Sequence, residues 1–386
     1  MTSSNYPNNP THPINPSSDG TMPPRLTKDE ADRRKTENES VLKQQPHSLW
    51  YYSWRRLRRN KLAIAGLCIT IVLIFIAVFA SFIAPFDPNM QVLEYSTKPI
   101  GFQGNVLLSK SEVDPSQTIP IPIGEYRIQG NKVIYTTDDG RDKSIPISKL
   151  AGSSEKEWHK TPTYYLGSDD KGRDVMTRLM YGARISLSVA FFAELCSLII
   201  GILIGSISGF YRGWVDDVLM WFTNVVWSIP SLLLIIAISI ALGVGLWVTI
   251  IAIGVTEWVD MARIVRGQFF SLRETEYVEA TKALGLSNMR TIFRHILPNL
   301  LGPIIVIATA GFANAIIYEA SLSFLGVGVQ PPTATWGKMI KDGYGYITSP
   351  NWGLTVFPAL AIMLAVFAFN LFGDGLRDAF DPKLKR

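Results

Sequence analysis

The sequence predicts an all-α polytopic membrane protein with six transmembrane helices and a small β-rich insert between the first two. Six stretches hold about twenty mostly apolar residues each, the length with which an α-helix crosses about 30 Å of hydrocarbon. Lys and Arg concentrate before the first stretch and between the fourth and the fifth, a distribution typical of cytoplasmic segments. A long polar segment with short β-type runs separates the first stretch from the second.

The N-terminal region has a polar tail and a basic segment. Residues 1–46 contain almost no large apolar side chain, so we expect a disordered cytoplasmic tail. Residues 47–61 place Trp50, Tyr51 and Trp54 before a run of Arg and Lys, which predicts a basic helix lying in the membrane interface. A nucleic-acid-binding patch is the alternative for this run, but a predicted span follows at once, and we expect no nucleic-acid partner.

Each predicted span is bounded by polar or turn-forming residues. The expected bounds are 62–85, Ser186 to Phe210, Val218 to Leu242, Trp247 to Ile264, Leu300 to Phe324, and Trp352 to Phe372. Gly201, Gly205 and Gly209 recur at four-residue steps in the second span, which indicates close helix packing or, alternatively, gaps in a lipid-facing surface. Pro230 is expected to kink the third span, because a proline removes one helical hydrogen bond.

Residues 86–185 form the expected extracytoplasmic insert. Short strand signals lie on either side of Gly130 and Asn131, a pair that favours a turn. Long segments cross the membrane regardless of their charge, so the insert does not decide the orientation. The insert could dock a solute-binding protein or only add bulk, and the sequence leaves both open.

The orientation follows from the loop 262–299, which lies within a core domain at 186–386. This loop holds six Lys and Arg against three Glu and is therefore expected to be cytoplasmic. Together with the basic segment before residue 62, it places both termini in the cytoplasm.

Several polar side chains fall inside the predicted spans. Glu194, Asn314 and Glu319 are the candidates for the translocation path, because a polar group at that depth is costly and usually faces a cavity or a partner. Glu257 and Asp260 could instead form salt bridges with two arginines further along the same helix. The sequence has no HExxH motif, and its two cysteines lie in apolar runs, so we expect neither a metal site nor catalytic residues.

Residues 276–303, which we call the bracket, hold two helical patterns joined at one glycine. Gly285 suits the left-handed conformation at the end of the first helix, and Ser287 can cap the second. Pro298 is expected to end or kink the second helix. One face of the first helix is formed by Tyr277, Ala280, Thr281 and Leu284, and the apolar stripe of the second by Met289, Ile292, Phe293, Ile296 and Leu297.

The amino-acid sequence of the bracket resembles the "EAA" loop of permease subunits in binding-protein-dependent ABC importers. In that family the loop docks into a cleft of the cytoplasmic ATPase subunit. The resemblance therefore implies an ATPase-coupling role for six residues: Glu279, Ala280, Thr281, Gly285, Leu297 and Pro298. Thr281 stands in place of a second alanine, and His295 in place of a branched apolar residue, but both keep the helical periodicity. An ordinary helical hairpin between two spans is the alternative.

Two further stretches resemble the C-type permease of dipeptide, oligopeptide and nickel importers. They read LGSDDKGRDVMTRLMYGARISL from Leu166 and EASLSFLGVGVQPPTATWGKMI from Glu319. The likeness covers residues 55–86 and 164–386 but not the middle of the insert. It implies a type I ABC importer permease of the bacterial cytoplasmic (inner) membrane. The implied partners are the lipid bilayer, a B-type permease, two ABC ATPase subunits and an extracytoplasmic substrate-binding protein.

The function that the resemblance implies is import of di- or oligopeptides, with this chain forming half of the translocation path. A nickel chelate or another small solute is the alternative substrate. The chain lacks the Walker A sequence, so ATP and Mg are expected on the partner ATPases and no cofactor on this chain. A stand-alone secondary transporter with Glu194, Glu257 or Glu319 as proton relays is a different class, disfavoured because no internal repeat is visible. An intramembrane enzyme is disfavoured by the missing motifs.

Overall fold

The computed structural model describes residues 49–111, 118–137 and 140–380. The tail expected at 1–46 and the basic C-terminal end therefore lie outside the described residues. The chain divides into two units, and Ser53–Arg386 holds the spans, the insert and the bracket. Helix α2 (Leu49–Leu57) forms where the basic interfacial helix was predicted, with Tyr51 and Trp54 about half exposed.

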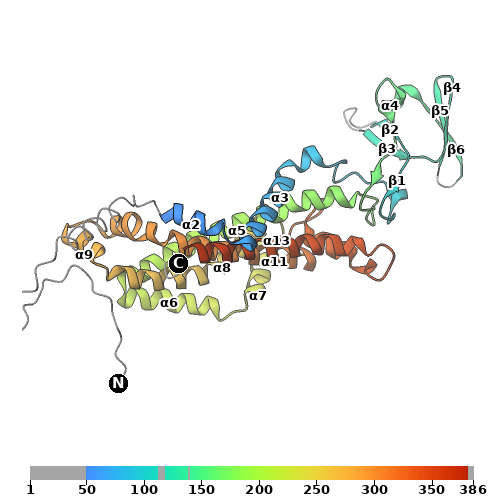
Figure 1. The fold of residues 1–386 in the computed structure, drawn as a ribbon. Coiled ribbons are helices and arrows are strands. Elements are labelled where there is room, and N and C mark those ends of the chain that lie inside the picture. The colour runs from blue at the N-terminus through green and yellow to red at the C-terminus, as the bar shows by residue number, and fades with distance from the viewer. Residues whose placement is uncertain (1–48, 112–117, 138–139, 381–386) are drawn as a thin grey trace, which may run out of the picture. The chain divides into compact units, whose positions relative to one another are not determined.

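A helix, or a pair of helices, lies at each position where a span was predicted (Figure 1). Within the described residues, four are long and apolar enough to cross a membrane: α3 (Lys61–Ile83), α5 (Val175–Tyr211), α11 (Leu301–Leu325, continuous with the helical turns from Asn288), and α13 (Gly353–Phe380). A fifth span results if α6 (Gly213–Trp227) and α7 (Ser231–Leu242) cross together. Helix α8 (Leu246–Arg273), at the fourth predicted span, has 28 residues but is not among these candidates, because it carries Glu257, Asp260 and Arg263 within its apolar part.

The helix bounds depart from the predicted ones where polar residues extend a helix. Helix α5 begins at Val175, because the Asp174 carboxylate caps it and accepts a hydrogen bond from the Thr177 N–H at 2.6 Å. The insert is correspondingly shorter than 86–185. Pro230 does not kink one helix; it separates α6 from α7, which meet at 87°. The missing N–H and the restriction on the preceding Ile229 explain this break.

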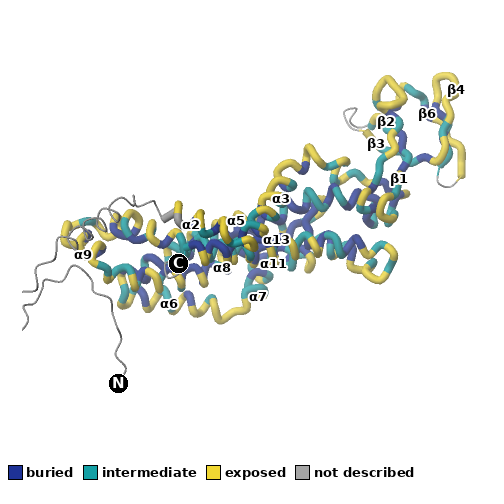
Figure 2. Tube along the Cα trace, in the orientation of Figure 1, coloured by how far each residue is buried: buried dark blue, intermediate teal, exposed yellow. Residues whose placement is uncertain are grey.

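Helix α5 packs against α8 through the predicted row of glycines. A Cβ added at Gly201 would lie 2.6 Å from Cβ of Met261, and one at Gly209 would lie 2.6 Å from Cβ of Phe269. Real side chains do not approach so closely, so the glycines allow the two helices to touch. This confirms close packing rather than gaps facing lipid. Helices α3, α11 and α13 complete the bundle, whose interior is buried while α6 and α9 are largely exposed (Figure 2).

The insert is β-rich, as predicted. β2 (Val106–Lys110) pairs antiparallel with β3 (Thr118–Pro122) and β7 (His159–Lys160), while β4 (Tyr126–Gln129), β5 (Lys132–Thr136) and β6 (Asp142–Pro146) form a second sheet. The predicted turn joins β4 to β5, with Gly130 at φ +60°. β1 (Phe102–Gln103) pairs with β8 (Thr163–Tyr164), and the Gly104 N–H donates to the Pro162 carbonyl at 2.9 Å. The insert's own core includes Leu107, Val133 and Trp158, the last residue of α4 (Glu155–Trp158).

An ion cluster joins the base of the insert to α12 (Trp336–Gly343). The Arg173 guanidinium donates to Asp169 at 2.6 Å and lies 3.8 Å from Asp342 of α12. Burial raises the pKa of Asp170, and the neighbouring carboxylates of Asp169 and Asp342 raise it further. Helix α12 also contacts α5, α11 and α13.

Candidate functional site

The first arm of the bracket is α9 (Glu276–Ala283), which ends in a Schellman motif at Gly285. The Gly285 N–H donates to the Lys282 carbonyl at 2.9 Å, and the Leu286 N–H donates to the Thr281 carbonyl at 3.1 Å. Gly285 has the left-handed φ of +71° that the sequence predicted. No atom lies within 4 Å of a Cβ added there, so backbone conformation alone favours glycine.

The second arm changes its helix type rather than ending at Pro298. The Ser287 hydroxyl caps α10 (Asn288–Arg290) by accepting from the Arg290 N–H at 3.4 Å. A π-helical turn (Thr291–Ile296) and a 3₁₀ turn (Leu297–Leu300) then lead into α11. Because Pro298 has no N–H, carbonyls in the preceding turn lose a donor, and the Asn299 side chain donates to the His295 carbonyl at 2.7 Å.

Hydroxyl groups and a small core hold the two arms together. The Thr281 hydroxyl donates to the Val278 carbonyl at 2.7 Å and lies 3.3 Å from the Thr291 hydroxyl of the second arm. The Asn299 side chain donates to the Tyr277 hydroxyl at 3.3 Å. Thr281 is one of the two departures from the plainest loop motif, and no sequence pattern predicts that its hydroxyl connects the arms. Val278, Ile292 and Ile296 are buried with Phe210 of α5 and Phe269 of α8.

The bracket exposes an apolar surface bordered by charge. Of the face predicted on the first helix only Thr281 is buried, and Leu284 is 78% exposed. Met289 and Phe293 of the second arm are 55% and 41% exposed. Among the six predicted coupling residues, Leu297 is half-buried, and the exposed ones are Glu279, Ala280, Gly285 and Pro298. Clustered exposed apolar side chains mark an interaction surface.

A cavity of about 450 Å³ lies among the helices that the bracket connects. It is lined from α5, α8, α11 and α13, in the half of α8 that leads into the bracket and the half of α11 that leaves it. Glu194 and Asn314 line this cavity, whereas Glu319 does not. Its charged and amide side chains are Glu194, Glu257, Asp260, Arg263, Asn314, Asn370, Asp374 and Arg377.

Glu194 is the most deeply buried carboxylate of the cavity. Its residue is 6% exposed, and in the described part of the chain no group donates a hydrogen bond to it. A Cβ added at Gly311 of α11 would collide with this carboxyl group, so Gly311 provides the space that it occupies. The role of Gly311 was missed, because a single glycine in an apolar helix gives no periodic signal.

Glu319 has a different environment from Glu194. The Ser186 and Ser323 hydroxyls each donate to its carboxylate at 2.7 Å, and the Trp336 N–H donates to Ser186 at 3.3 Å. The carboxylate therefore joins α5, α11 and the start of α12 in a buried, hydrogen-bonded cluster.

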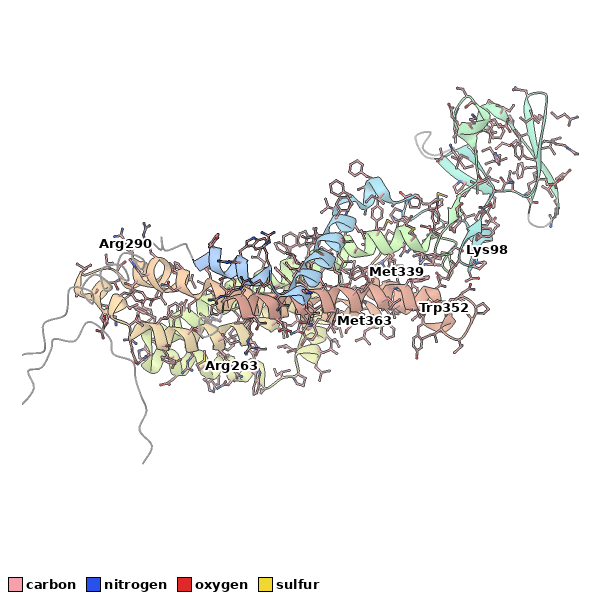
Figure 3. The ribbon with its side chains drawn as sticks, in the orientation of Figure 1. Lys98, Arg263, Arg290, Met339, Trp352 and Met363 are labelled. Atoms are coloured by element: carbon pink, nitrogen blue, oxygen red, sulfur yellow. The ribbon has the colours of Figure 1, made fainter. Side chains whose placement is uncertain are left out.

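Arg263 and Arg266 of α8 bond to α6 rather than to carboxylates of their own helix. Arg263, whose place in the fold is marked in Figure 3, donates to the Asn224 side chain at 2.8 Å and stacks over the Trp227 ring, with 4.2 Å to the centroid. Arg266 donates twice to Asp216, at 2.6 Å for each bond. The alternative of salt bridges from Glu257 and Asp260 to these arginines is therefore wrong, because α6 offers partners with better geometry.

The described residues contain no group of three or more His, Cys, Asp and Glu side chains placed to hold a metal ion. Cys68 and Cys196 are both free thiols. The site is thus a cavity with an unneutralised acidic wall, attached to an exposed bracket.

Comparisons with known proteins agree with this architecture. Residues 201–386 match the family described as "Binding-protein-dependent transport system inner membrane component", and residues 48–99 match the "N-terminal TM domain of oligopeptide transport permease C". The chain is 39% identical to the dipeptide transport system permease protein DppC of Alkalihalophilus pseudofirmus, over 88% of this chain and 91% of that protein. It is 37% identical to the oligopeptide transport system permease protein OppC of Bacillus subtilis, with the same coverage of both chains.

Two further proteins resemble this chain at lower sequence identity. The chain is 34% identical to the glutathione transport system permease protein GsiD of Escherichia coli, over 87% of this chain and 91% of that protein. A chain of the inward-facing MetNI methionine ABC transporter overlaps 53% of this chain, with a TM-score of 0.44 and 20% identity. The identity and coverage of the permease relatives are decisive: this chain belongs to the binding-protein-dependent transport system inner membrane components, as a multi-pass permease of the C type.

Proposed function

We propose that this chain is the permease subunit of an ATP-driven importer of di- or oligopeptides and forms half of its translocation path. The names of the most similar relatives support a peptide as the substrate. The observation that carries the proposal is the direct connection between an exposed bracket and the walls of a polar cavity.

The connection is covalent at both ends of the bracket. Helix α8 lines the cavity and ends at Arg273, three residues before α9. The second arm runs without a break into α11, which lines the opposite wall. The buried core between the arms also includes Phe210 of α5. A force on the bracket therefore moves three cavity-lining helices together, because a packed core transmits displacement rather than absorbing it.

The proposed partners follow from the surfaces that this chain leaves exposed. Two ATPase subunits bind ATP and Mg and dock on the bracket surface around Glu279 and Leu284. A B-type permease closes the cavity from the open side, and a substrate-binding protein delivers the peptide outside. The chain itself performs no covalent chemistry. The bracket and both termini face the cytoplasm and the insert faces outward, provided that α6 and α7 cross the membrane as one broken span.

Charge reversal at Glu279 tests the coupling role. Glu279 is exposed and its side chain makes no hydrogen bond in the described part of the chain, so Glu279→Lys should leave the membrane level of the protein unchanged. Co-purified ATPase should fall by about 5-fold or more, the effect of losing one or two kcal/mol at an interface. Glu125→Lys, the same reversal on an exposed residue of the insert, should retain normal ATPase association. Normal ATPase association and uptake with Glu279→Lys would contradict the proposal.

Uptake by the reconstituted complex tests the substrate and the energy source. Proteoliposomes that contain both permeases and the ATPases, with the binding protein added outside, should accumulate a labelled dipeptide only when ATP is inside. Accumulation of nickel without competition by peptides would favour the alternative solute. Uptake by this chain alone, driven by a proton gradient, would instead identify a secondary transporter.

A further inference from the structure

We propose that the cavity contains an ammonium-binding subsite, formed by the carboxylates of Glu194 and Glu257, which receives the positively charged amino terminus of a peptide in transit. This subsite rests on the proposed function and adds a selectivity element within the permease itself.

Glu194 supplies the first half of the subsite. Its side chain is more than nine-tenths buried, lines the cavity, and has no hydrogen-bond donor in the described part of the chain. An isolated buried carboxylate costs several kcal/mol unless a cation or donors compensate it. Its carboxyl group lies against Gly311 of α11, in space that a larger side chain at position 311 would fill. The group is therefore held at the cavity wall without a partner from this chain.

Glu257 of α8 supplies the second half. Its side chain lines the same cavity as that of Glu194, from the facing helix α8. Asp260, nearly one helical turn further along α8, adds a third carboxylate. Two carboxylates that face one space repel each other, and a cation between them removes that repulsion.

Neither basic residue of the cavity forms an ion pair with this wall in the described part of the chain. Four carboxylates line the cavity against two guanidinium groups. Arg263 is already bonded to Asn224 and stacked on Trp227. Arg377 belongs to α13, and no carboxylate of the described residues lies within salt-bridge distance of it. The wall around Glu194 thus remains available to an incoming cation.

The rest of the cavity favours an organic cation over a metal ion. No three ligating side chains are placed for a metal among the described residues. Apolar side chains of Met261, Ile264, Val306 and Ile307 line the same space. A volume of about 450 Å³ lies in the range of small-molecule sites. An ammonium group attached to an amphipathic peptide matches both the acidic wall and this apolar lining.

The test compares a dipeptide with its desamino analogue, in which hydrogen replaces the amino group, in proteoliposomes that contain the whole importer. The ratio of the two uptake rates is measured for the wild type and for Glu194→Gln, with the same binding protein. The selectivity of the binding protein then cancels between the two measurements. Glu194→Gln should lower the ratio by about 10-fold, the loss expected for one charge-assisted hydrogen bond. Glu257→Gln should lower the uptake ratio as well. If Glu194→Gln fails to assemble, the ratio measured with Glu257→Gln tests the subsite.

Glu319→Gln is the matched control. It removes a buried carboxylate of the same bundle whose hydrogen bonds lie outside the cavity, so the ratio should not change even if the protein level falls. An unchanged ratio in both glutamine variants of the subsite would overturn the proposal and indicate that these carboxylates stay protonated. Loss of the B-type permease from both variants would also overturn it, because the carboxylates would then serve subunit pairing. If the wild type shows no ATP-dependent dipeptide uptake, the proposed function and the subsite fall together.

Discussion

Gly285→Ala is the most direct test of whether the bracket must hold one backbone shape. Gly285 has a φ of +71°, a conformation that costs an L-residue about 1–2 kcal/mol. Because an added Cβ would have no atom within 4 Å, the substitution introduces no clash, and the whole cost is backbone strain. The free chain can relax this strain by distorting the corner between the two arms.

Docking of the ATPase should then have to restore the strained conformation. A cost of about 1–2 kcal/mol corresponds to a 5- to 30-fold change in an equilibrium constant, so the affinity of the ATPase subunits should fall within that range. The assay titrates purified ATPase subunits onto the permease pair in nanodiscs and follows the ATP hydrolysis stimulated by peptide-loaded binding protein. The membrane level and the melting temperature of the permease should change little, since the corner is exposed.

Gly267→Ala is the matched control. Gly267 is also exposed and also has no atom within 4 Å of an added Cβ, but it lies inside α8 with ordinary helical dihedrals. Alanine there should be neutral or stabilising by about 0.5–1 kcal/mol. The reasoning is refuted if both variants weaken the ATPase equally, or if Gly285→Ala lowers the melting temperature while ATPase affinity stays normal. The second outcome would make the bracket a purely structural corner.

Four further predictions concern the topology, the insert, the contact between α5 and α8, and the ion cluster around Arg173. With both native cysteines replaced, a cysteine at Ser144 should react with an impermeant thiol reagent in intact cells, and one at Ser287 only after permeabilisation; labelling of both in intact cells would make α6 and α7 a re-entrant hairpin. Replacing residues 105–161 by a short linker should preserve ATP hydrolysis by the complex, because the flanking residues are already joined by a 2.9 Å hydrogen bond; loss of the complex from the membrane would show that the insert is structural. Gly205→Val should destabilise the protein by about 1–3 kcal/mol through overpacking against α8, seen as a lower melting temperature, and an unchanged value would contradict the tight contact. Asp170→Asn should raise the melting temperature near neutral pH, because folding raises the pKa of Asp170 and its ionised form therefore destabilises the folded state. The gain in melting temperature should disappear below pH 3.8, where the carboxyl group is protonated in both states. A gain that is the same at every pH would exclude this linkage.

The features that the sequence predicted well are those that a residue's own chemistry imposes. A left-handed corner requires glycine, which identifies Gly285, and a small residue repeated on one helix face allows close approach, which identifies the row from Gly201 to Gly209. Apolar length likewise located the spans. Their bounds were less predictable, since the start of α5 is decided by one capping carboxylate, Asp174, and not by hydropathy.

The features that the sequence could not supply depend on what a helix face contacts. Periodicity grouped Tyr277, Ala280 and Leu284 correctly on one side of α9, but it does not say whether that side is buried. The structure leaves all three exposed and buries Val278 instead. The contact between the Thr281 and Thr291 hydroxyls could not be predicted from the sequence either, because it forms only when the corner at Gly285 brings the two arms together.

The charge of the cavity could not be predicted from the sequence, because it depends on which residues of neighbouring helices pair with the arginines of α8. Within one helix, an exposed pair such as Asp260 and Arg263 contributes only about 0.2–0.5 kcal/mol. A partly buried, two-pronged pair such as Arg266 with Asp216 gains about 1.5–3 kcal/mol for each charged hydrogen bond, so the arginines turn to α6. The break at Pro230 separates α6 from α7, and α6 then lies along α8 and presents those partners. Since Arg266 pairs with Asp216 and Arg263 is held by Asn224 and Trp227, neither arginine forms an ion pair with the carboxylates of α8. The acidic wall that we assign to the peptide is thus a consequence of helix packing on the far side of α8.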